Sequence, residues 1–62
     1  MNSIGAKITE IRKRKGLSQE IVADKANINL RTLQRIEKGE TEPHGNTLRS
    51  LCEVLDVNVE VL

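Results

Sequence analysis

The side chains of this sequence that are best equipped for chemistry are basic, and they gather in the first part of the chain. Residues 1–39 hold nine Lys and Arg side chains against four Asp and Glu, whereas residues 40–62 hold one against five. A chain polarised in this way can present a positive face to phosphate groups although its net charge is only +1. The charge placement therefore favours an anionic partner over a chance distribution.

Catalysis and metal binding have no support in the residues. The chain has no glycine-rich phosphate loop and no Ser/His/Asp or Cys/His arrangement at a plausible spacing. One cysteine, Cys52, and one histidine, His44, supply too few ligands for a structural zinc site. We expect Cys52 to be a small core residue and His44 to be a solvated loop residue. Capping of the fourth helix and contact with phosphate are the alternatives for His44. We therefore predict no enzyme, no metal and no cofactor.

The length and composition predict one small aliphatic domain over residues 1–62. Hydrophobic residues make up 37% of the chain and none is aromatic, so Ile, Leu, Val and Ala must form the core. The missing aromatic residues also argue against binding of single-stranded nucleic acid, where bases stack on aromatic rings. No apolar run is long enough for a membrane span or resembles a signal peptide, so we expect a cytoplasmic protein without membrane contact.

Apolar residues recur at helical spacing in four segments, which predicts an all-α fold. The predicted helices cover about residues 4–15, 18–26, 29–38 and 46–55. Residues that can cap a helix N-terminus stand before the first three helices: Asn2 or Ser3, then Ser18, then Asn29. Gly16 and Gly39 follow the first and third helices as stop signals, and a turn-rich loop follows Gly39.

The tail Val57–Leu62 alternates apolar and polar residues, which is a strand pattern. A fifth helix cut short by the chain end is the alternative. An exposed strand edge would allow the tail to pair with its counterpart in a second copy of the chain. The tail is therefore our candidate for a homodimer contact.

The second and third helices are separated by a very short turn around Asn27. Asparagine tolerates the left-handed conformation that such a turn needs, and small Ala23 lies where the two helices must approach. A turn this short forces a steep crossing angle and leaves the third helix protruding. These positions meet the physical requirements of a helix-turn-helix.

The sequence resembles the phage repressor and Cro-type (xenobiotic-response-element type) helix-turn-helix family. The resemblance is carried by residues 11–20, 23–28, 32–39 and 47–57 together with Pro43, in order and at the right spacing. It implies a compact four- to five-helix bundle of the lambda-repressor-like type. It also implies that the third helix, at about 29–38, enters the major groove of DNA.

Carried over residue by residue, the resemblance implies a set of DNA contacts. Candidates for reading base edges lie on the third helix: Leu30, Arg31, Thr32, Gln34 and Arg35. Candidates for phosphate contact are Ser18, Gln19, Asn29 and Lys38, together with the backbone amides that follow Gly39. Arg12 and Glu37 match a partly buried ion pair between the first and third helices, which makes them structural residues.

The resulting functional hypothesis is sequence-specific binding of double-stranded DNA by a transcriptional regulator that acts as a repressor. One helix in one groove is a small interface, so we expect a homodimer on a pseudo-palindromic operator with half-sites about 34 Å apart. The alternative is a protein-interaction module, or the head of an antitoxin-type or sensor-linked protein, that keeps the fold but binds little DNA. No residue pattern indicates a small-molecule effector.

Overall fold

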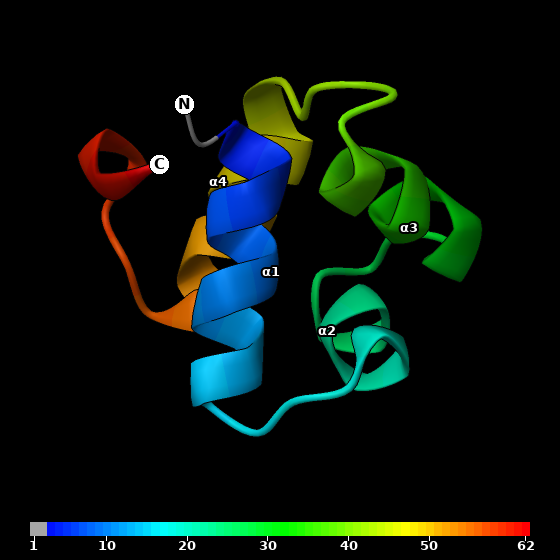
Figure 1. Ribbon diagram of the computed structural model, residues 1–62, viewed down its shortest axis with the longest axis horizontal. Coiled ribbons are helices and arrows are strands. Elements are labelled where there is room, and N and C mark those ends of the chain that lie inside the picture. Colours follow the sequence, from blue (N-terminus) through cyan, green and yellow to red (C-terminus); the bar gives the residue numbers. More distant parts are fainter. Residues whose placement is uncertain (1–2) are drawn as a thin grey trace.

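The computed structural model describes residues 3–62, which form four α-helices followed by a single turn of 3₁₀ helix (Figure 1). The elements are α1 (Ile4–Arg14), α2 (Gln19–Lys25), α3 (Leu30–Lys38), α4 (Gly45–Leu55) and the 3₁₀ turn η1 (Val59–Val61). The predicted all-α fold is confirmed, and each predicted helix is present close to its predicted bounds. None of the helices within residues 3–62 is long and apolar enough to cross a membrane.

Side-chain caps begin the first three helices. The Oγ atoms of Ser3 and Ser18 accept hydrogen bonds from the amides of Ala6 and Ile21, each over 3.1 Å. The Oδ1 atom of Asn29 accepts from the amide of Arg31 over 2.8 Å. These bonds satisfy amides that have no partner within the helix. Asn2, the other predicted cap of α1, lies outside the described residues, and the side chain of His44 makes no capping hydrogen bond to α4.

All four helices end in the same turn, in which one residue adopts a left-handed conformation. In order from α1 to α4 these residues are Gly16, Asn27, Gly39 and Asp56, and their φ values are 70°, 57°, 81° and 57°. The next amide bonds back to a carbonyl five residues earlier, as from Ile28 to Ala23 over 2.9 Å. This helix ending, which is closed by two backbone hydrogen bonds, is the Schellman motif. After α1, α2 and α4 the returning residue is apolar and packs against the core (Leu17, Ile28 and Val57).

The core is aliphatic, as the composition predicts. Its largest fully buried side chains come from all four helices: Ile8, Val22, Leu33, Ile36, Leu51 and Leu55. Helix α3 packs against α1 and α2, and α4 packs against α2. Cys52 is buried, and burial raises the pKa of its thiol. In Figure 1, α4 lies behind α1, while α3 lies at the opposite side of the molecule from η1.

The backbones of α1 and α3 approach each other closely at a point where α1 has no side chain. Gly5 is buried, and a Cβ atom built on it would lie 1.9 Å from the carbonyl oxygen of Ile36. The backbone of α3 therefore packs directly against α1 at Gly5. Only glycine leaves room for that approach.

We expect Gly5→Ala to lower the free energy of unfolding by about 1–3 kcal/mol, because the methyl group would push α3 away from α1. In an unobstructed helix the same change would stabilise by up to about 1 kcal/mol, so the sign of the effect is diagnostic. Urea unfolding measures it. Lys13→Ala, at an exposed position of α1, is the control and should change stability by less than about 0.5 kcal/mol. A more stable Gly5→Ala variant would contradict the close packing.

Of the two alternatives for Val57–Leu62, the strand is wrong, and the segment instead contains a single turn of 3₁₀ helix, nearer to the short fifth helix. No strand within residues 3–62 is available to pair with this tail, and an unpaired strand leaves its backbone amides without partners. A 3₁₀ turn satisfies two of them internally, because the amides of Val61 and Leu62 bond to the carbonyls of Asn58 and Val59 over 2.9 and 3.1 Å. The alternation instead leaves Val59 and Val61 on the outer side, 53% and 50% exposed, while Leu62 packs against the core.

Candidate nucleic-acid interface

One face of α3 forms a shallow surface groove that collects most of the predicted contact residues. The groove is lined by Asn29, Leu30, Arg31, Gln34, Arg35, Lys38 and Glu40. Residues three and four apart on a helix share one face, which explains why these positions lie together. Four of the five predicted base-contact residues and two of the four predicted phosphate-contact residues thus lie along the same groove.

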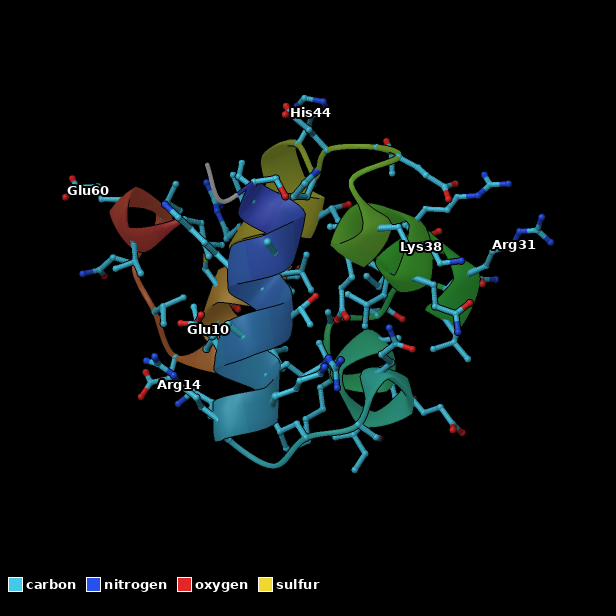
Figure 2. The ribbon with its side chains drawn as sticks, viewed as in Figure 1. Glu10, Arg14, Arg31, Lys38, His44 and Glu60 are labelled. Carbon is cyan, nitrogen blue, oxygen red and sulfur yellow. The ribbon has the colours of Figure 1, made fainter. Side chains whose placement is uncertain are left out.

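The basic side chains of this face extend into solvent. Arg31, Arg35 and Lys38 are all exposed, and none of them forms an ion pair within residues 3–62. Figure 2 shows Arg31 extending from α3 on the side away from α1, whereas Glu60 projects from η1 at the other end of the molecule. The exposed face of α3 therefore carries three cations that form no ion pair in the described part of the chain.

Two groove positions differ from the sequence prediction. Thr32 is exposed on α3 but does not line the groove, because it lies on the side of the helix opposite Leu30 and Gln34. Glu40 lines the groove and was not predicted. It is the returning residue of the Schellman turn after α3, and its amide donates to the carbonyl of Arg35 over 3.0 Å. The left-handed Gly39 was the available signal that the next residue would fold back.

This turn also bears on the predicted phosphate contacts after Gly39. The amide of Glu40, the first in that stretch, is already bonded to Arg35 and has no further hydrogen to donate. The carboxylate of Glu40 adds a negative charge at this end of the groove. Lys38 is therefore the strongest phosphate candidate at the end of α3.

The remaining phosphate candidates lie at helix N-termini. The oxygens of Ser18 and Asn29 serve as caps of α2 and α3. Their own hydrogens, on the Ser18 hydroxyl and the Asn29 amide, have no acceptor within residues 3–62. A helix N-terminus with such donors suits an anion. Capping and phosphate contact are compatible, because they use different atoms of the same side chain.

Beneath the groove, an ion pair joins α1 to α3. The Nε and Nη2 atoms of Arg12 donate to Oε2 and Oε1 of Glu37 over 2.8 and 3.0 Å, in a two-pronged arrangement. The two side chains are only 10% and 5% exposed. Arg12 also donates from Nη1 to the carbonyl of Leu17 over 2.9 Å, which fixes the link between α1 and α2. The pair therefore holds α1, α3 and the link between α1 and α2 together.

Glu37 is also the acceptor for two uncharged donors. The Oγ1 atom of Thr9 donates to its Oε1 atom over 2.9 Å, and the Nε2 atom of Gln19 donates to the same oxygen over 3.1 Å. Burial on its own would raise the pKa of Glu37, but hydrogen bonds from Arg12, Gln19 and Thr9, with the charge of Arg12, hold it below the ordinary value. Glu37 is therefore ionised at neutral pH.

Acidification is expected to remove the stabilisation that Glu37 provides. The carboxyl of the unfolded chain takes up a proton near the ordinary value of 4.5, whereas that of the folded protein does so only at lower pH. The unfolded state therefore binds more protons in this window, and the free energy of unfolding falls as the pH drops below 4.5. Above that pH the contribution is fully present.

Urea unfolding of the wild type and of Glu37→Gln across this pH range measures the effect. The difference in stability between the two proteins should shrink as the pH falls. A difference that stays constant with pH would show that Glu37 does not titrate with a lowered pKa.

A family model described as helix-turn-helix (HTH_3) matches residues 8–62. Among solved structures, the N-terminal DNA binding domain of SinR from Bacillus subtilis superimposes with a TM-score of 0.85 and 34% sequence identity. The match covers 94% of this chain and 86% of that one. Among curated protein sequences, none matches the chain significantly.

Proposed function

The chain belongs to the Cro/C1-type helix-turn-helix family of DNA-binding transcription regulators, and from this premise we propose that it reads specific duplex sequences with α3 and acts as a repressor. The observation that carries the proposal is the groove along α3, where Leu30, Arg31, Gln34 and Arg35 lie side by side. The major groove of B-DNA is wide enough to admit an α-helix. The function is that of a regulator rather than an enzyme.

The contacts divide by chemistry into two groups. Arg31 and Arg35 carry planar forks of donors that suit the O6 and N7 atoms of guanine, and Leu30 suits a thymine methyl group. Lys38 is a flexible point charge that suits phosphate, as do the donors at the N-terminus of α2. Base contacts specify the sequence, and phosphate contacts position the protein on the duplex.

Binding to fluorescent duplex DNA, followed by anisotropy at increasing salt, tests DNA binding itself. Each neutralised phosphate contributes a slope of about −0.9 to the logarithm of the binding constant against the logarithm of salt concentration. We expect a steep loss of affinity with salt. An absence of binding at low salt to both genomic and random duplexes would contradict the proposal and leave the protein-interaction module as the function.

Repression would follow from occupancy of an operator that overlaps a promoter. Transcription in vitro from a promoter that carries a selected binding site tests this step. We expect the protein to reduce transcript yield from that template and to leave a template without the site unchanged. Increased yield would make the protein an activator.

We further propose that the protein binds as a homodimer through η1. Val59 and Val61 are two of the three large apolar side chains that are strongly exposed within residues 3–62, the third being Ile21 of α2. Because η1 lies on the side of the molecule away from α3 (Figure 1), association there leaves the groove of α3 accessible. A second copy of the chain is the occupant that a two-fold operator requires.

Sedimentation of the wild type and of a Val59→Asp/Val61→Asp variant tests the dimer. We expect the wild type to sediment as a dimer and the variant as a folded monomer with weaker binding to a two-half-site duplex. Glu60→Gln, in the same turn, is the control and should remain dimeric. A monomeric wild type at high concentration, both with and without DNA, would exclude η1 as an interface.

A further inference from the structure

Leu30 is the one apolar side chain among those of residues 3–62 that line the groove of α3. The other lining residues are all polar or charged: Asn29, Arg31, Gln34, Arg35, Lys38 and Glu40. Leu30 is half-buried and also packs against the hydrophobic core. One part of its side chain is therefore held by the core while another part faces the groove.

The backbone on both sides of Leu30 is held by hydrogen bonds. The side chain of Asn29 accepts from the amide of Arg31 over 2.8 Å, and its carbonyl accepts from the amide of Leu33 over 3.1 Å. Leu30 is the first residue of α3 and lies between these two anchors. A group that meets Leu30 therefore meets an apolar surface that has little conformational freedom to lose on binding.

The chemistry of leucine limits what Leu30 can recognise in a major groove. Its side chain has no hydrogen-bond donor or acceptor, so it cannot distinguish the O4 atom of thymine from the N4 amino group of cytosine. The apolar group that a base pair presents there is the C5-methyl group of thymine. A cytosine methylated at C5 carries the same group at the same position of the ring. Leu30 therefore distinguishes a methylated pyrimidine from an unmethylated one.

We propose that Leu30 is a specificity-determining residue for the C5-methyl group of a pyrimidine, and that the protein binds a site with 5-methylcytosine at that position more tightly than the same site with cytosine. The inference rests on the proposed function, since it assumes that α3 lies in the major groove. It extends that function by making the affinity for an operator respond to cytosine methylation. Burial of one methyl group strengthens binding about fourfold.

Anisotropy titrations on a site selected from a random duplex library test the proposal. At each pyrimidine of one half-site, two pairs of duplexes are compared whose members differ only in the methyl group: thymine with uracil, and 5-methylcytosine with cytosine. We expect the wild type to bind the methylated member about fourfold more tightly in both pairs at one position. Leu30→Ala should bind the two members of each pair there within about 1.5-fold of each other.

Glu53→Gln, at an exposed position of α4, is the control and should keep the wild-type preference for the methyl group. Thermal unfolding establishes that each variant is folded. If Leu30→Ala is not, Leu30→Val takes its place, because it retains apolar packing against the core but reaches less far into the groove. Leu30→Val should lower the preference for the methyl group below about twofold.

Two results would overturn the inference while leaving DNA binding intact. The first is equal affinity of the wild type for both members of every pair. The second is an unchanged methyl preference in the folded Leu30 variant, which would assign the preference to the shape of the methylated duplex instead. Failure of the wild type to bind any duplex would overturn the proposed function itself.

Discussion

Arg12→Met is expected to lower the free energy of unfolding by about 3 kcal/mol or more, the largest loss that we predict for a single side chain. The change removes the positive partner of Glu37 and leaves its carboxylate buried with two uncharged donors. An unpaired buried charge costs far more than the intact pair contributes. The Arg12→Met change also removes the hydrogen bond from Arg12 to the carbonyl of Leu17, which holds the link between α1 and α2.

Chemical denaturation monitored by far-ultraviolet circular dichroism measures this loss. The matched control is Arg14→Met, two residues along the same helix. Arg14 pairs with Glu10 over 3.0 Å, but these side chains are 75% and 57% exposed. Exposed pairs at this spacing contribute about 0.3–0.5 kcal/mol, so Arg14→Met should change stability little. Equal losses in the two variants would contradict the structural role of the buried pair.

Arg31→Ala and Lys38→Ala are expected to impair DNA binding in different ways. Arg31→Ala should cost about 1–3 kcal/mol of discrimination at one base pair, because a bidentate contact is lost. Lys38→Ala should weaken binding to all duplexes alike and reduce the salt slope by about 1. The distinction follows from the fork geometry of the arginine and the point charge of the lysine.

Anisotropy titrations on a selected duplex, on single-base variants of it and on a random duplex measure both effects. Lys13→Ala serves as a charge-matched control, since Lys13 is an exposed cation on α1 outside the groove. It should leave base preference unchanged and affect affinity least. If Arg31→Ala and Lys38→Ala reduced binding identically on every duplex, the division into base and phosphate contacts would be wrong.

The local features of the fold were predictable because they depend on neighbouring residues. The helix bounds follow from apolar spacing and from capping residues such as Ser18, and the left-handed turn follows from Asn27. The tail was not predictable in the same way. Its alternation describes which residues share a face, whereas a strand depends on whether another strand lies beside it. That condition is set by the whole fold.

Most residues of the candidate site could be predicted from the sequence, whereas the hydrogen bonds that join them could not. Helical spacing is enough to place Arg31 and Arg35 on one face. The bonds that join Gln19 to Glu37 and Gln34 connect three segments, so their geometry arises only from tertiary packing. Glu40 enters the groove because of a backbone turn, and Gly5 matters because of a backbone on another helix. Gly39 signals the turn that brings Glu40 back, whereas Gly5 has no strong signal in the local sequence.

The measurement that tests the central claim most directly is the change in backbone amide chemical shifts when duplex DNA is added to the isotopically labelled protein. If α3 enters the major groove, the largest changes should fall on residues 30–38 and at the N-terminus of α2. Residues of α4 that face away from the duplex should change little. Changes concentrated in α4 or η1, with α3 unaffected, would contradict the assignment of α3 as the recognition helix.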